Sequence, residues 1–242
     1  MERSPPRAVS RPELLAVVAA LVDAVRRGHP TRVAFDGPDA AGKTTLADEL
    51  APVLRDRGRR VIRASVDGFH RPRAARYARG ADSAVGYYLD SFDYDAVRDV
   101  LLDPLGPGGD RSYRRAIFDH RVDRPVAGPV ESASPSAVLL FDGVFLQRPE
   151  LREGFDLCVF LAVSFDEVLR RALEREVPLL GSRDDVERRY RTRYIPGQRL
   201  YFAQARPEER ADVVVRNDDP AAPVLERVGG RALSPGTGRP AR

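Results

Sequence analysis

The 242-residue sequence contains very little cysteine and no long hydrophobic run. Cys158 is the only cysteine, so no disulfide can form within the chain, and its place in the apolar run LCVFLAV predicts a small buried side chain. No stretch approaches 18 apolar residues, which argues against a membrane-spanning helix. The apolar segment LLAVVAALVDAV is interrupted by Asp23, and no small-residue cleavage site follows it, so we interpret it as a helix and not as a signal peptide. We therefore expect a cytoplasmic protein with no membrane partner.

Runs of like charge are also missing. The net charge is +4, and no five consecutive residues carry the same sign. Nucleic-acid binding is therefore not expected, since basic stripes interleaved with aromatic residues are absent. With 43% hydrophobic and 31% charged residues, the composition is that of an ordinary globular protein, and its modest positive charge suits an anionic small molecule.

Lysine is the scarcest of the basic residues. Lys43 is the only one, so 39 of the 40 basic side chains are arginine. An ammonium is a compact point charge with three rotatable donors, whereas a guanidinium is a broad planar fork. Position 43 thus indicates a site that closes tightly around an anion.

Short, fully apolar segments alternate with helical segments along the chain, which is typical of a parallel sheet covered on both faces. The sequence predicts strands at 31–35, 59–66, 137–141, 157–163 and 211–215, and helices at about 11–27, 43–58 and 165–176. Ser10 with Glu13, and Ser164 with Glu167, form capping boxes before two of these helices. We expect one α/β domain over residues 11–218 with a five-stranded parallel sheet, a disordered N-terminus at 1–10 and a flexible tail at 219–242.

Three of the predicted strands end in Asp-Gly, at Asp36, Asp67 and Asp142. Asp-Gly makes a good turn, so any one of these pairs would carry little weight. Open α/β sheets, however, bind ligands at the carboxyl ends of their strands. Three carboxylates at that edge, one of them directly before a glycine-rich loop, favour a site for phosphate and metal.

The loop AFDGPDAAGKTT contains the pattern G-x-x-x-x-G-K-[ST], placed between a predicted strand and a predicted helix. Glycines let successive N–H groups point at phosphate oxygens, and the helix adds its positive end. Lys43 would reach the β- and γ-phosphates, and the hydroxyl of Thr44 would coordinate Mg²⁺. The residues expected to hold ATP are Gly37, Pro38, Asp39, Ala40, Ala41, Gly42, Lys43, Thr44 and Thr45. These features predict a P-loop NTPase fold.

Other P-loop classes fit the sequence less well. A GTPase needs an Asn-Lys-x-Asp motif, which a chain with one lysine cannot supply. Transport and helicase ATPases usually carry two adjacent acids at the strand end where this chain has Asp142 followed by Gly143.

The blocks GPDAAGKTTLADEL, SVDGFHRP, YYLDSFDYDAV, LLFDGVFL and VFLAVSFDEVLRRALERE, followed by RYIPGQRLYFAQARPEERADVVVRND, resemble the uridine kinase and phosphoribulokinase family of P-loop kinases, and most of all its bacterial uridine kinase-like branch. The resemblance covers about residues 14–218. It implies that Asp67 is the general base and that Asp142, an aspartate where the family usually has glutamate, contributes to magnesium binding directly or through water.

The resemblance also implies an acceptor site and a small helical lid. The acceptor-binding residues would be Asp67, Phe69, His70, Tyr88, Asp90, Phe118, Asp119 and His120. The lid, at about 175–190, would bring Arg171, Arg175 and Arg183 over the phosphates. Arg170, Arg188 and Arg189 are interpreted as solvated helix charges.

The resemblance predicts an enzyme that transfers the γ-phosphoryl group of ATP to a hydroxyl of a nucleoside, uridine or cytidine. The block SFDYD lacks the His-Pro pair of uridine kinases, so another small-molecule acceptor, such as pantothenate or a sugar phosphate, stays open. A regulatory protein that binds nucleotide without an acceptor is a further alternative. A homo-oligomer is also left open.

Overall fold

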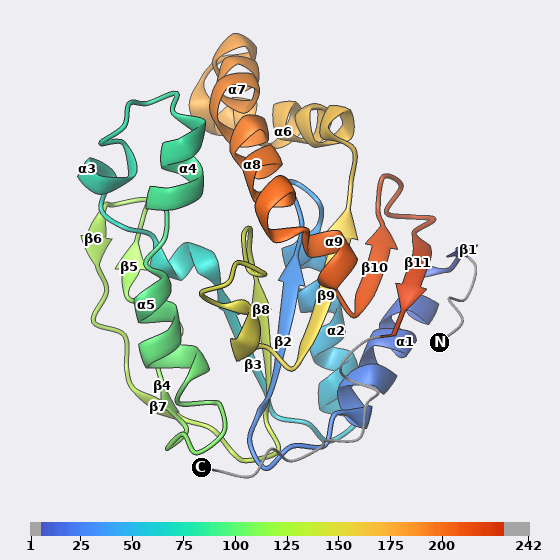
Figure 1. Cartoon of the computed structure of the whole chain (residues 1–242). Helices are drawn as coiled ribbons and strands as arrows, with labels where there is room; N and C mark the ends of the chain where they lie inside the picture. Colours follow the sequence, from blue (N-terminus) through green and yellow to red (C-terminus); the bar gives the residue numbers. More distant parts are fainter. Residues whose placement is uncertain (1–5, 230–242) are drawn as a thin grey trace.

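A seven-stranded sheet forms the centre of the computed structural model, which describes residues 6–229 (Figure 1). Its strand order is β1-β11-β10-β9-β2-β8-β3. The strands are β1 (Arg7–Ala8), β2 (Thr31–Asp36), β3 (Val61–Ser65), β8 (Val138–Asp142), β9 (Leu157–Ala162), β10 (Val213–Arg216) and β11 (Val224–Val228). The five strands predicted from the sequence are β2, β3, β8, β9 and β10, and all of them run parallel.

The prediction of only five strands is wrong, because two antiparallel strands extend one edge of the sheet. Strand β11 pairs with β10, and β1 pairs with β11. Residues 1–10 were expected to be disordered and residues 219–242 to form a flexible tail, which is incorrect where these segments contain the two strands. Residues 1–5 and 230–242 lie outside the described part. Strand β11 reads VLERV, and its two charged residues interrupt the continuous apolar run that is typical of a buried parallel strand. Val9, only 5% exposed, fixes β1 against the core.

Side chains alternate between the two faces of the sheet and build one core on each side. Val33 and Phe35 pack with α1 (Arg11–Ala24), α2 (Lys43–Asp56) and α6 (Phe165–Leu180). Phe141 faces the opposite way and packs with α4 (Ala84–Asp90), α5 (Tyr94–Val97) and α8 (Ile195–Ala205). Figure 1 shows α5 and α8 on the near side of the sheet and α1 and α2 on the far side.

The predicted helix starts are confirmed by their caps. The hydroxyl of Ser10 accepts a hydrogen bond from the backbone N–H of Glu13, and Ser164 does the same for Glu167. Helix α1 ends at Ala24, three residues before the expected end, while α6 continues to Leu180. None of the helices within residues 6–229 combines the length and apolar character needed to cross a bilayer.

The remaining elements are short. They are α3 (Arg73–Arg76), α7 (Arg183–Arg189), α9 (Pro207–Arg210), the 3₁₀ helices η1 (Val66–Phe69) and η3 (Arg152–Gly154), the π-helical turns η2 (Arg98–Leu102) and η4 (Tyr190–Tyr194), the pair β4 (Ser112–Tyr113) and β7 (Glu131–Ser132), and the pair β5 (Phe118–Asp119) and β6 (Arg124–Pro125). In Figure 1, α3 and α4 lie beside α7 above the carboxyl ends of the parallel strands.

Candidate active site

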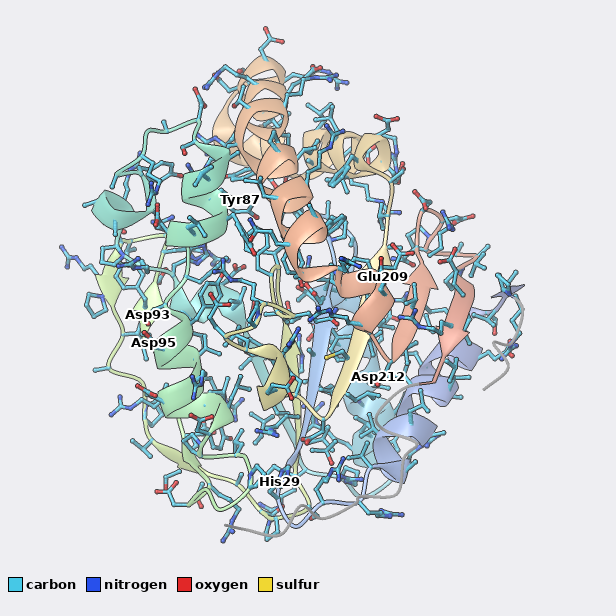
Figure 2. All side chains as sticks on the ribbon, in the orientation of Figure 1. His29, Tyr87, Asp93, Asp95, Glu209 and Asp212 are labelled. Atoms are coloured by element: carbon cyan, nitrogen blue, oxygen red, sulfur yellow. The ribbon has the colours of Figure 1, made fainter. Side chains whose placement is uncertain are left out.

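A cavity of about 770 Å³ opens at the carboxyl ends of the parallel strands. Its walls come from the P-loop, η1, α3, α4, the turn after β5, the end of β8, and the segment from α6 to η4. Figure 2 shows Tyr87, one of its lining residues, between α4 and α8, whereas His29 lies at the opposite end of the molecule. The cavity thus occupies the position where α/β sheets bind ligands.

The P-loop geometry depends on its two glycines. Gly37 has φ +146°, and a Cβ there would approach the carbonyl oxygen of Leu161 to 2.5 Å. Gly42 has φ +87°, in the left-handed region, and stands directly before the first residue of α2. Both positions therefore require glycine, as the phosphate-binding motif predicts.

Lys43 is almost completely buried at 8% exposure. Its Nζ donates to the carbonyl oxygens of Gly37, at 3.1 Å, and of Pro38, at 2.6 Å. Burial lowers the pKa of the ammonium, while the carboxylates of Asp39 and Asp36 oppose that shift. The loop therefore encloses the ammonium and lines the cavity with it.

Asp36 does not line the cavity, although it ends a strand like the other two aspartates. Its carboxylate accepts hydrogen bonds from the N–H of Gly37, at 2.9 Å, from the amide of Gln147, at 3.2 Å, and from the hydroxyl of Tyr201. Burial raises the pKa of Asp36 despite these donors. Its place in the structure is that of an anchor for the start of the P-loop.

Thr44 and Asp142 meet at the predicted metal position. The hydroxyl of Thr44 donates to Oδ2 of Asp142 at 2.7 Å, and Arg63 donates to Oδ1 at 2.8 Å. Hydroxyl and carboxylate oxygens suit Mg²⁺, which usually keeps several waters and takes further ligands from phosphates. Residues 6–229 contain no group of three or more His, Cys, Asp or Glu able to hold a metal alone. The pair fits Mg²⁺ that arrives with a nucleotide.

Asp67, His70 and His120 line the same cavity from its other side. The side chain of Asp67 is 63% exposed. His70 Nδ1 lies 3.0 Å from the backbone oxygen of Asp67, and its ring lies 4.5 Å from each of the rings of His120 and Phe92. Burial lowers the pKa of His70. The structure therefore brings these three residues of the predicted acceptor site to one cavity.

Three aromatic or apolar members of the predicted acceptor site lie in the core and not in the cavity lining. Phe69 is fully buried and packs edge to face against Phe141. Tyr88 is 3% exposed beneath the guanidinium of Arg148, 4.4 Å from its ring centre. Phe118 is 6% exposed in β5. Core packing, the ordinary role of aromatic residues, accounts for all three.

The two predicted acidic acceptor residues are also outside the lining. Asp90 accepts a hydrogen bond from Arg79 at 2.8 Å, and Asp119 accepts one from the N–H of Arg121 at 2.9 Å. Each carboxylate thus stabilises local structure.

Arg171 lies behind the P-loop instead of over it. Its guanidinium donates to the carbonyl oxygens of Ala40, at 3.1 Å, Asn217, at 2.7 Å, and Asp218, at 2.8 Å, and pairs with Glu167 at 2.6 Å. Its side chain joins the loop to the segment after β10.

Only one of the three predicted lid arginines lines the cavity. Arg175 does so and pairs with Glu176 at 2.6 Å, whereas Arg183 is exposed at the start of α7, outside the lining. The predicted lid, at about 175–190, corresponds to the end of α6, Gly181 with φ +93°, and α7.

Several lining residues were not found from the sequence. They are Arg73, Arg76, Tyr77, Phe92, Arg121, Arg189, Tyr190 and Tyr194. Tyr87, which belongs to the block YYLDSFDYDAV of the family resemblance, also lines the cavity. The interpretation of Arg189 as a solvated charge is wrong, because its side chain faces the cavity. The run RPRAAR follows directly on the Asp67 block and would have indicated Arg73 and Arg76.

No protein-family model and no curated protein sequence matches the chain. Solved structures do match. A possible uridine kinase from Bacillus stearothermophilus is 24% identical with a TM-score of 0.65, covering 84% of this chain and 97% of that chain. D-glycerate 3-kinase from Cryptococcus neoformans var. grubii is 15% identical with a TM-score of 0.58, covering 77% and 88%. Phosphoribulokinase from Rhodobacter spheroides is 16% identical with a TM-score of 0.53, covering 78% and 70%. These similarities confirm the predicted α/β fold of P-loop kinases.

Proposed function

We propose that this chain, which has the fold of P-loop kinases, is a Mg²⁺- and ATP-dependent kinase that phosphorylates a hydroxyl of a small molecule. One observation supports this most strongly: Lys43 and Thr44 of the phosphate-binding loop line the same cavity as Asp67. A kinase needs a phosphate site and a base for the acceptor hydroxyl within one enclosed space.

The nucleotide end of the cavity supplies fixed positive groups. The N–H groups of the loop, the start of α2 and the ammonium of Lys43 would bind the triphosphate, and Thr44 and Asp142 would hold the metal. Bound Mg²⁺ neutralises charge on the phosphates. Arg63, paired with Asp142 at 2.8 Å, reduces the negative charge of that carboxylate, which favours contact with the metal through water.

At the acceptor end, Asp67 would accept the proton of the attacking hydroxyl as the bond to phosphorus forms. Its exposed carboxylate is free to approach a substrate. Arg175 and Arg189, from the two helices beside Gly181, would offset charge on the transferred group and exclude water. Arg171 would contribute by positioning the P-loop through Ala40.

The sequence resemblance points to uridine or cytidine as the acceptor, and one similar structure is described as a possible uridine kinase. Two others are named for acceptors that carry a carboxylate or a phosphate. Tyr88 and Phe118 lie in the core, so they cannot stack on a nucleoside base in the cavity. Only the aromatic residues of the lining, such as Phe92 and Tyr77, could do so.

Measurement of ADP release tests the proposal. Mg-ATP is incubated with uridine, cytidine, pantothenate, ribulose 5-phosphate or no acceptor. Acceptor-dependent release supports a kinase, whereas equal slow release in every mixture, the blank included, would favour a regulatory nucleotide-binding protein.

The same assay on Asp67→Asn tests the base. We expect turnover to fall by about 10²- to 10⁴-fold while ATP affinity stays near that of the wild type. Asp95→Asn is a matched control, since Asp95 is exposed on α5, away from the cavity (Figure 2). Full turnover by Asp67→Asn would show that another group is the base.

A further inference from the structure

The cavity carries more positive than negative side chains. Its charged lining consists of Lys43, Arg73, Arg76, Arg121, Arg175 and Arg189, against four carboxylates. A ligand that fills the cavity therefore meets a cationic surface.

Most of the carboxylates in the lining are already bound by protein groups. Asp142 accepts from Thr44 and Arg63, as described above. Glu176 accepts from Arg175 and from the hydroxyl of Tyr190, each at 2.6 Å.

Asp39, the acid of the P-loop, is also bound by protein groups. It accepts hydrogen bonds from the hydroxyl of Tyr87, at 2.9 Å, and from the amide of Gln198, at 2.7 Å. Asp67, the proposed base, is the one remaining acid of the lining; its side chain is 63% exposed, and Oδ1 lies 3.9 Å from Nδ1 of His70, beyond hydrogen-bond distance.

The arginines beside Asp67, in contrast, are largely unpaired. Among residues 6–229, no carboxylate lies within 4.0 Å of the guanidinium groups of Arg73, Arg121 or Arg189. Arg76 pairs with Asp123 at 3.3 Å, but its Nε is buried and has no hydrogen-bond partner in the structure.

These arginines come from three separate segments and converge on the acceptor end. The guanidinium groups of Arg73 and Arg76 both lie over the ring of Tyr77, at 5.5 and 5.7 Å from its centre. Arg121 follows His120, whose ring lies tilted beside that of His70, with the ring centres 4.5 Å apart. Like charges gathered in one cavity repel each other unless an anion is bound between them.

We propose that the phosphoryl acceptor is itself an anion, a small alcohol that carries a phosphate or carboxylate group bound by Arg73, Arg76 and Arg121, with Arg189 closing over it. This inference rests on the proposed kinase function and narrows its substrate class. Guanidinium groups bind carboxylate and phosphate through paired N–H donors, which fits a convergent set of arginines. The cationic lining therefore favours anionic acceptors over uridine and cytidine, which are neutral.

The test compares acceptors that differ only in the anionic group: ribulose 5-phosphate with ribulose, D-glycerate with glycerol, and pantothenate with panthenol. We expect kcat/KM to be higher for an anionic member by about 10- to 100-fold for each guanidinium contact it makes. The three pairs separate phosphate from carboxylate. A neutral acceptor such as uridine with the highest kcat/KM would overturn this inference and leave the kinase proposal standing.

Two variants test whether these arginines cause the preference for an anionic acceptor. Arg121→Gln and Arg73→Gln should each raise KM for the anionic acceptor by about tenfold or more and leave ATP affinity within about twofold. Arg71→Gln, the same charge change at an exposed position outside the cavity, is the matched control. If the two variants weaken the binding of Mg-ATP as much as that of the acceptor, the arginines bind the triphosphate and the inference is wrong.

A binding experiment decides the case in which no acceptor of the panel turns over. Inorganic phosphate is titrated into the full chain saturated with Mg²⁺ and a non-hydrolysable ATP analogue, and heat release is measured. Binding that is lost in Arg121→Gln and kept in Arg71→Gln supports the inference. No binding, or binding that the variants do not change, would overturn it independently of the kinase assay.

Discussion

Replacement of Lys43 with arginine keeps the charge at the centre of the P-loop but changes its shape. Lys43 is 8% exposed, and its ammonium already donates to the carbonyl oxygens of Gly37 and Pro38. Of its three N–H donors, one is left for a phosphate oxygen. A guanidinium is a wider planar group whose five donors are fixed in a fork, so it cannot occupy this enclosure without displacing the loop.

The expected loss of nucleotide affinity follows from the one N–H donor that is left for phosphate. A hydrogen bond to a charged group contributes about 1.5–3 kcal/mol, so loss of it weakens nucleotide binding by about 10- to 150-fold. We expect Lys43→Arg to lose as much affinity as Lys43→Met, because the lost contact depends on shape and not on charge. Titration calorimetry with Mg-ATP measures the affinity, and a thermal melt establishes that each variant is folded.

Retention of affinity by the arginine variant would refute this reasoning. If Lys43→Arg binds Mg-ATP within about threefold of the wild type while Lys43→Met does not, charge alone is sufficient at this position. If both variants bind normally, the ammonium does not contact the triphosphate.

Three further substitutions test the supports of the loop. Tyr201→Phe removes a donor to buried Asp36 and should cost about 1–3 kcal/mol, or roughly 2–4 °C in Tm for each kcal/mol. Burial raises the pKa of Asp36 in the folded state above its unfolded value, so the folded protein keeps this carboxyl protonated to a higher pH. The loss of stability in Tyr201→Phe should therefore be smallest at acid pH and grow as the pH rises through the folded-state pKa. Thermal melts at several pH values measure this loss. Thr44→Val should raise the Mg²⁺ concentration needed for half-maximal turnover, and an unchanged Mg²⁺ titration would remove Thr44 from the metal site. Arg171→Lys should weaken Mg-ATP binding in a folded protein, since an ammonium cannot reach the three carbonyls that the guanidinium joins; unchanged affinity would show that this clamp is dispensable.

The parts of the fold that the sequence predicted correctly are those encoded by contiguous residues. A parallel strand such as β8, which reads VLLFD, is apolar up to its last residue because both of its faces are buried, and the Asp-Gly pair marks its end. Topology then brings strand ends to one edge, which is why Asp67 and Asp142 were expected in one cavity. Strand β11, which reads VLERV, carries Glu226 and Arg227 and lacks that pattern, so it was missed.

Side-chain direction on short elements could not be predicted in the same way. Tyr87 and Tyr88 are adjacent on the seven-residue helix α4, and they differ completely in role. Tyr87 lines the cavity and donates to Asp39, whereas Tyr88 packs beneath Arg148. One helical step of about 100° separates them, and only the packing of α4 against its neighbours decides which one reaches the ligand side.

The scarcity of lysine has a counterpart in how the structure uses arginine. Arg193 is 2% exposed and donates to four backbone carbonyls, those of Arg76, Gly80, Ala81 and Ser83, and so ties the loop around α3 to η4. Arg171 joins three carbonyls beside the P-loop. A branched planar head with five donors can join several carbonyls at once, which an ammonium with three donors on one atom does less well. Arginine is therefore favoured where several backbone segments must be held together. Lysine is required where one loop closes around a small cation and must leave room for phosphate. Position 43 is where this chain meets that second condition.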